Sequence, residues 1–300
     1  DIKELSQGNL PSKSDDNAVV VVSHATSSYM AYSKPVNPCV IRLYKDRNGK
    51  AQLDTLLNID NTKLLTDSVV MENALNFIAA TFDAKSYGMI YSSHATGWLP
   101  SGYYAHPSTY DHPEGKSEGG RQAAARRMTS GSPYSEFSLP GPKVKSVGQE
   151  IQYDDQAKVN YSYEMEINDL ASSIPFKLDY ILFDACLMGC VEVAYELRNV
   201  CDRIGFSPAE VLTDGMDYAQ MLSRLLKPGT PDLNAVAQDY FDLHAAQSGD
   251  YQSATYTIVN CREIEALAAE CKSLFEKYRE DIALVDAKRV QHYHRYEQHW

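Results

Sequence analysis

A cysteine and a histidine, each placed at the end of an apolar run, are the residues of this 300-residue chain best suited to chemistry. Cys186 follows the run 180–184, and a helix-type pattern begins behind it; the run 87–92 leads to His94. At a strand-to-helix junction, free amides and the helix dipole favour a thiolate. Although 92 positions (186 minus 94) separate the two residues, parallel strands bring their carboxyl ends to one sheet edge. We therefore predict a Cys186–His94 pair for nucleophilic catalysis.

A second histidine competes for the role of proton shuttle. The letters Ser-His-Ala-Thr occur at 23–26 and again at 93–96, and His24 also ends an apolar run. Only the second copy is followed by a Gly-Trp pair, at 97–98. We interpret His94 as the shuttle and His24 as a chance repeat or a residue at the rim of the site.

The two chemical residues need strands to position them, and the apolar runs supply the candidates. We expect strands at 18–23, 39–44, 87–92, 180–184 and 254–259. Helix-period segments lie between or after several of these runs. Such alternation predicts an α/β fold in which helices cover both faces of a mainly parallel sheet.

Two local signals refine this picture. The Asn48-Gly49 pair is typical of a hairpin turn, which predicts an antiparallel addition at the sheet edge. Thr66 is expected to cap the helix that begins near Val69 and leads toward the His94 strand.

The chain divides, in our interpretation, into a catalytic core and a smaller addition. Residues 1–230 form the core, which includes a long surface loop at 100–145, rich in Gly, Pro, Ser, Tyr and His. Long loops after catalytic strand ends are often functional, and a disordered insertion is the alternative. Residues 231–300 add the last sheet strand and a small helical C-terminal subdomain.

Composition limits the class of partner. A hydrophobic content of 44% is enough for a sizeable core, and a net charge of −12 argues against nucleic acid and anionic membranes and favours basic substrates. No run approaches the ~18 apolar residues of a membrane span. The six cysteines show no disulfide framework and no Cys-x-x-Cys zinc spacing, so we expect most to be reduced and buried. We expect a monomer.

Around both junctions the chain resembles the clostripain family of cysteine peptidases, in the clan of caspases, gingipains and legumain. The resemblance rests on His-Ala-Thr-Gly-Trp at 94–98 and Asp-Ala-Cys-Leu-Met at 184–188, and it extends to Ser207 and the run 213–218. It implies a bacterial protein with a caspase-like, three-layer α/β/α sandwich. It also implies a cysteine endopeptidase that cuts after Arg or Lys through the Cys186–His94 dyad.

The resemblance also implies roles for neighbouring residues. Asp184, Asp214 and Ser207 would line the first specificity pocket, where two carboxylates would select a cationic side chain; Asp214 alone reads equally well as a turn residue before a glycine. The amides of Ala95 and Cys186 would form the oxyanion hole, with Ala95 standing where the family usually has Gly. The sequence requires no cofactor. Ca²⁺ is suggested by the family alone, since no Asp-x-Asp-x-Asp-Gly loop occurs.

Maturation is a further expectation of the resemblance. We expect a secreted or cell-envelope zymogen that cuts itself after Lys145, with Lys143 and Arg127 as the next candidates. Compared with the family pattern, the chain lacks a first strand and stops early, which suggests a fragment or a trimmed form. The main alternative is a catalytically silent relative that binds basic peptides. An unrelated α/β hydrolase or redox protein is disfavoured, because neither Gly-x-Ser-x-Gly nor Gly-x-Gly-x-x-Gly occurs.

Overall fold

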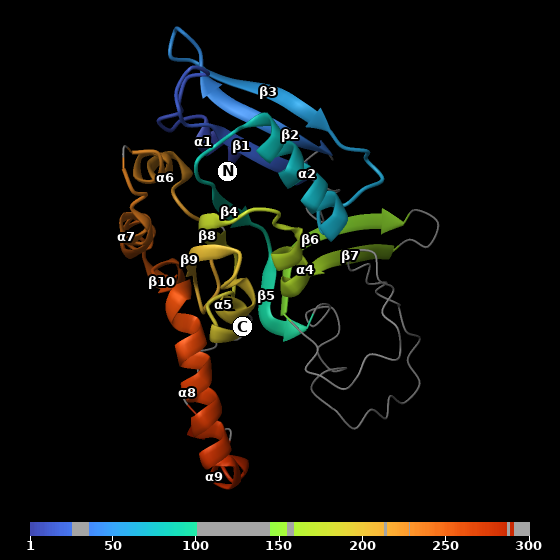
Figure 1. Cartoon of the computed structure of the whole chain (residues 1–300). Coiled ribbons are helices and arrows are strands. Elements are labelled where there is room, and N and C mark those ends of the chain that lie inside the picture. Colours follow the sequence, from blue (N-terminus) through green and yellow to red (C-terminus); the bar gives the residue numbers. More distant parts are fainter. Residues whose placement is uncertain are drawn as a thin grey trace.

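The computed structural model describes residues 1–25, 36–100, 145–154, 159–212, 215–227, 229–286 and 289–290, which form an α/β fold (Figure 1). The strands are β1 (Val19–Ala25), β2 (Val36–Lys45), β3 (Ala51–Asn58), β4 (Gly88–Ser92), β5 (Ala95–Pro100), β6 (Lys145–Asp154), β7 (Val159–Glu166), β8 (Leu178–Asp184), β9 (Cys201–Phe206) and β10 (Thr257–Asn260). The helices are α1 (Ile2–Leu5), α2 (Ser68–Thr81), α4 (Ile167–Ser173), α5 (Val191–Leu197), α6 (Tyr218–Leu225), α7 (Leu233–Ala245), α8 (Ile264–Lys277) and α9 (Arg279–Ala283). Short 3₁₀ helices are η1 (Gly249–Tyr251) and η2 (Cys261–Glu263).

The central sheet has the strand order β10-β9-β8-β4, with β4, β8 and β9 parallel and β10 antiparallel to β9. Side chains of β8 alternate between two hydrophobic clusters. Ile181 and Phe183 lie in a cluster with residues of α4 and α5, whereas Tyr180 and Leu182 lie in a cluster with residues of α6 and α7. A strand buried on both faces needs an unbroken apolar run, which is what 180–184 provides.

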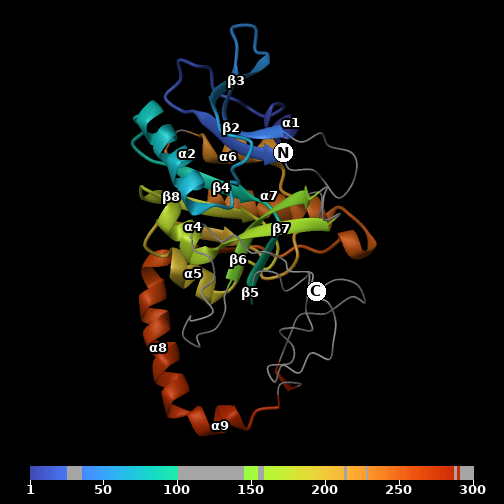
Figure 2. The ribbon, with the colours of Figure 1, turned by 90° about the vertical axis from the view of Figure 1, so that its right-hand side faces the viewer.

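The other two sheets are antiparallel. One has the order β1-β2-β3, and its β2–β3 hairpin turns through Gly49 at a φ of 75°, which confirms the turn predicted at Asn48-Gly49. The other has the order β5-β6-β7. Outside the sheets, α8 projects from the body and carries α9 at its far end (Figure 2).

The predicted α/β class is confirmed, but the expected single, mainly parallel sheet is not what the described strands form. They make three sheets, and the parallel pairs are β4–β8 and β8–β9. The physical reason is connectivity: strands separated by only a few residues of sequence, such as β2 and β3 or β6 and β7, must pair antiparallel, whereas parallel neighbours need a longer crossover. Strand β10 joins the central sheet beside β9. The division of the chain at 230/231 stays a prediction.

Two local expectations also change. Asp67, rather than Thr66, caps α2, because its carboxylate accepts hydrogen bonds from the amides of Val69 and Val70. Pro100 and Lys145, which bounded the predicted loop, belong to β5 and β6, and residues 101–144 lie outside the described part of the chain. Among the described helices, none is long and apolar enough to cross a membrane.

Candidate active site

The parallel pairing of β4 with β8 brings the two predicted catalytic residues to one sheet edge. Ser92 lies opposite Asp184 in the last pair of this register. His94 lies two residues after Ser92, and Cys186 lies two residues after Asp184. The Ser93 amide donates to the Asp184 carbonyl at 3.3 Å, so the alignment continues past the end of the ladder.

The segments that follow the two residues lie against each other. Gly97 has a φ of 58°, and a Cβ added to it would lie 1.9 Å from the Leu187 carbonyl oxygen. Leu187 itself has a φ of 62°, the one positive value among the described non-glycine residues. Because only hydrogen occupies the place of a side chain at Gly97, the backbone after His94 can approach the backbone after Cys186 this closely.

Strand β6 holds the main chain around His94. The Gly148 amide donates to the His94 carbonyl at 3.0 Å, and the Gln149 amide donates to Ser93 Oγ at 3.0 Å. The His94 side chain is exposed at this edge. The position of the imidazole therefore depends on how firmly β6 is anchored.

Glu150 provides that anchor. Its buried carboxylate accepts hydrogen bonds from the amides of Leu65 at 3.1 Å and Thr66 at 2.8 Å, from Thr66 Oγ1 at 2.6 Å, and from His24 Nδ1. Burial would raise the pKa of Glu150, but the hydrogen bonds from His24 and Thr66 outweigh it and hold the pKa below its usual range. His24 is thus a buried partner of Glu150 rather than a chance repeat or a rim residue.

The thiol of Cys186 contacts the main chain of Val211. The Val211 amide donates to Sγ at 3.3 Å, and Sγ lies 3.5 Å from the Val211 carbonyl oxygen. Neighbouring backbone bonds fasten the same two segments, from the Leu187 amide to the Ala209 carbonyl and from the Gly189 amide to the Ser207 carbonyl. The segment 207–211 therefore lies directly beside the half-buried nucleophile.

The expectation that a helix start activates Cys186 is wrong for this arrangement. Helix α5 begins at Val191, and the turn through Leu187 separates it from the thiol. Burial raises the pKa of Cys186; the Val211 amide offsets part of this rise, and the negative charges of Glu210 and Asp184 add to it. Together these effects favour the protonated thiol over the thiolate.

The residues predicted to line a specificity pocket have the following places. Asp184 is 9% exposed and accepts hydrogen bonds from the Tyr218 hydroxyl at 2.5 Å and from the Met216 amide. Burial raises the pKa of Asp184 against those hydrogen bonds. Ser207 is fully buried, and its hydroxyl bonds to the amide and carbonyl of Ala209. Asp214 lies outside the described residues.

The remaining candidates are placed as follows. Ala95 opens β5 opposite Val147 and needs no positive φ, so alanine fits without backbone strain where the family usually has glycine. Lys145 is the first residue of β6, whereas Lys143 and Arg127 lie outside the described residues. In the described part of the chain, no group of three or more His, Cys, Asp or Glu could hold a metal ion.

Sequence reasoning missed several contributors to this site. Glu150 carried no signal, because nothing local distinguishes a buried carboxylate within a β-type run. Val211 contacts the thiol through its main-chain amide and carbonyl, and the identity of its side chain does not predict such a contact. Tyr218 stood in the run that resembles the family, but without a role.

Comparisons with known proteins identify a matching family model and similar solved structures. The family model described as the clostripain family matches residues 141–299, which is 159 of the 300 residues (299 minus 141, plus one). No curated protein matches.

Solved structures are similar over most of the chain. One is described as an inactive zymogen C11 protease from Parabacteroides distasonis, with a TM-score of 0.68 and 22% identity over 99% of this chain and 68% of that one. Another is a secreted C11 cysteine protease from Bacteroides thetaiotaomicron in complex with an irreversible peptide inhibitor, with a TM-score of 0.60 and 25% identity over 89% of this chain and 62% of that one. The chain thus spans 68% and 62% of the length of these two proteins.

Proposed function

Because this chain belongs to the clostripain family of cysteine peptidases, we propose that it is an endopeptidase in which Cys186 and His94 form the catalytic dyad. The observation that carries this proposal is the β4–β8 register, which puts both residues at matching positions beyond adjacent strands. The close approach of Gly97 to Leu187 supports it further, because it joins the two segments directly. A caspase-like, three-layer arrangement of the assembled sheets is part of the proposal.

In the proposed mechanism the Cys186 thiol transfers its proton to the His94 imidazole, and its sulfur attacks the scissile carbonyl carbon. The amides of Ala95 and Cys186 stabilise the oxyanion, and the His94 imidazolium donates a proton to the leaving amine. Water, activated by His94, then hydrolyses the thioester and regenerates the thiol. Calcium, suggested by the family resemblance alone, has no assigned ligands, and no step depends on it.

The arrangement around the nucleophile supports a latent form. The Cys186 thiol is bound by Val211, and burial raises its pKa, so both its reactivity and its access are restricted. Movement of the segment 207–211 would free the sulfur and bring it closer to water. We propose that self-cleavage after Lys145, or else after Lys143 or Arg127, precedes this movement. The description of one structural neighbour as an inactive zymogen is consistent with this proposal.

Specificity for Arg or Lys would come from carboxylates near the nucleophile. Asp184 is buried and accepts hydrogen bonds from the Tyr218 hydroxyl and the Met216 amide. Its proposed contribution is therefore to position the segment that follows Asp214. Asp214 would then meet the substrate cation directly, and the buried Ser207 would shape the pocket through the backbone. We also propose that the protein is secreted, as the description of one structural neighbour says of that neighbour. A monomeric state is the last part of the proposal.

Active-site titration tests the dyad. A lysyl or arginyl acyloxymethyl ketone should form one adduct per chain on Cys186 once the latent form has been activated, by self-cleavage or by limited digestion with a second protease. Cys186→Ala should abolish the adduct and His94→Ala should slow it strongly, whereas a leucyl ketone should react poorly. Labelling of another cysteine would refute the assignment, and reversible binding of the basic probe without any adduct would favour the silent, peptide-binding relative.

The pocket is tested separately with Asp214→Asn. A charged hydrogen bond commonly contributes about 1.5–3 kcal/mol, so kcat/KM for an arginyl substrate should fall by roughly ten- to a hundredfold. A leucyl substrate serves as the control, since its weak turnover should not change. Equal turnover of both substrates by the unaltered protein would refute the preference for basic residues.

A further inference from the structure

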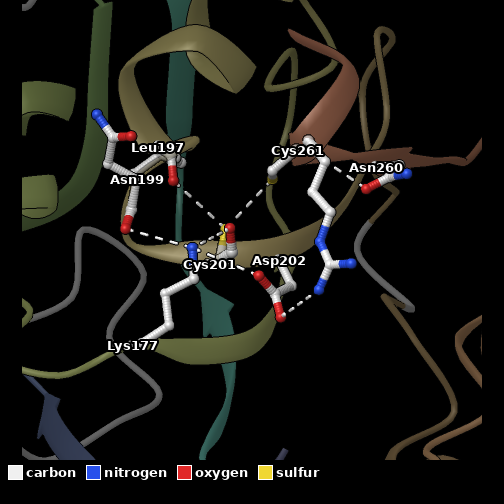
Figure 3. A network of polar contacts seen from close by, with 8 residues as sticks. Lys177, Leu197, Asn199, Cys201, Asp202, Asn260 and Cys261 are labelled. Carbon is white, nitrogen blue, oxygen red and sulfur yellow. Dashed lines mark hydrogen bonds and ion pairs between the residues drawn. The ribbon is translucent and has the colours of Figure 1, made fainter. Parts of the chain in front are cut away.

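Two cysteines that are 60 positions apart in the sequence (261 minus 201) meet in the core. Cys201 is fully buried, Cys261 is 5% exposed, and their sulfur atoms are 3.7 Å apart (Figure 3). Cys201 opens β9, and Cys261 opens η2 directly after β10, the antiparallel partner of β9. Neither residue belongs to the proposed catalytic mechanism.

The residues around the two thiols hold their backbones together. Asp202 and Arg262, which directly follow the two cysteines, pair at 3.7 Å, and Lys177 reaches Asp202 at 3.5 Å. The Lys177 ammonium also donates to the Cys201 carbonyl at 2.9 Å (Figure 3). Each ion pair is partly exposed and weak by itself. Together with the β9–β10 ladder they fix the register in which the thiols face each other.

This geometry suits a disulfide. An S–S bond is about 2.05 Å long, so the two sulfur atoms must approach by roughly 1.7 Å, which small side-chain rotations can supply. A metal site is the other common use of paired thiols, but it needs further ligands. Among the described side chains no third donor of a metal site lies nearby.

We propose that Cys201 and Cys261 form an internal disulfide when the chain meets a small-molecule disulfide as oxidant. The Cys261 thiol loses its proton, and its sulfur attacks one sulfur of the oxidant, whose S–S bond breaks and releases a thiolate that takes up a proton. Cys201, deprotonated in turn, attacks the Cys261 sulfur of the mixed disulfide and expels the second small thiol. Two protein thiols and one disulfide give one protein disulfide and two small thiols, a two-electron oxidation of the protein.

Cys261 is the better first nucleophile on two grounds. It is the more exposed of the two. A hydrogen bond from Cys201 lowers the pKa of Cys261, while the same bond and burial raise the pKa of Cys201. The thiolate is the reactive form, so exchange starts at Cys261 and ends at Cys201.

The cross-link would fasten η2, and with it α8, to the central sheet. It would close a loop that contains α6, α7 and β10, which restricts the unfolded chain. The nucleophile Cys186 would stay a free thiol.

The test starts from the Cys186→Ala protein, in which the nucleophile cannot react. This protein is refolded or incubated with oxidised or with reduced glutathione, denatured, alkylated and digested, and its peptides are identified by mass. We expect the oxidised sample to contain the Cys201 peptide joined to the Cys261 peptide, with both residues protected from alkylation until a reductant is added. Full alkylation of both thiols, pairing with any other cysteine, or glutathione retained on Cys261 without closure would each overturn the proposal.

Thermal unfolding provides a second readout with a matched control. Oxidation should raise the Tm by about 5–10 °C, as expected for a cross-link across a long loop. In Cys39→Ala, which removes another buried thiol, the gain should persist, whereas in Cys261→Ala it should vanish. An equal gain in all three proteins would place the effect at another site.

Discussion

The contact between Gly97 and Leu187 predicts that a single methyl group at Gly97 damages the active site. In Gly97→Ala the new Cβ would meet the Leu187 carbonyl oxygen at 1.9 Å. The neighbour is main chain, so no side-chain rotation can relieve the clash. One of the two segments must move by about 1 Å or more, and this separates His94 from Cys186.

The expected size of the effect has two parts. A φ of 58° is unfavourable for any residue with a Cβ, by about 1–2 kcal/mol. Forcing an extra carbon into a packed contact adds about 1–3 kcal/mol. A displacement of about 1 Å in a catalytic pair can lower turnover about a hundredfold.

Gly49→Ala is the matched control. Gly49 also has a positive φ, of 75°, but a Cβ there meets nothing within 4 Å. It should therefore show the backbone strain alone. Urea unfolding of both variants should show Gly97→Ala less stable than Gly49→Ala by about 1–3 kcal/mol, and only Gly97→Ala should slow labelling of Cys186 by the ketone probe. Equal stability and equal labelling in the two variants would refute this account of the site.

Three further predictions concern buried ionisable groups. In the latent form, the rate of Cys186 alkylation by iodoacetamide should rise with a pH midpoint above that of an ordinary thiol, and Glu210→Gln should move this midpoint down. An unchanged rate-pH profile in the variant would contradict the effect of the Glu210 charge. Glu150→Gln should reduce the unfolding free energy by about 2–4 kcal/mol in urea at pH 7, since it weakens a buried charged network. Because the folded protein lowers the pKa of Glu150, this carboxylate stabilises the fold above the pKa that it has in the unfolded chain, and the stabilisation is lost as the pH falls through the folded pKa. The difference in unfolding free energy between Glu150→Gln and the parent should therefore become smaller in acid. Tyr218→Phe should cost about 1–3 kcal/mol and raise the pKa of Asp184 further, because the carboxylate loses its hydroxyl partner; an unchanged unfolding midpoint would argue against that hydrogen bond.

Much of the site's framework could be predicted from local patterns. The apolar runs before His94 and Cys186 gave β4 and β8 nearly to the residue, and the Asn48-Gly49 pair gave the hairpin. Strand burial and tight turns depend on short stretches of sequence, so a short stretch suffices to recognise them.

The missed features depend on pairings over long chain distances. The bond between His24 and Glu150 spans 126 positions, and nothing in either local stretch indicates it. The same holds for Cys201 and Cys261. The start of the helix after Cys186 differs for another reason. The apolar pattern typical of a helix begins directly after Cys186, but the positive φ of Leu187 interrupts helical backbone there, so α5 begins only at Val191.

The way in which the core is shared has a consequence for a chain cut between residues 100 and 145. The part before the cut and the part after it both contribute to each hydrophobic cluster, and they also share the β4–β8 and β5–β6 pairs. Neither fragment alone would contain both His94 and Cys186. The cut protein would therefore be a tightly associated two-chain complex, in which separately produced halves restore a complete site only by folding together.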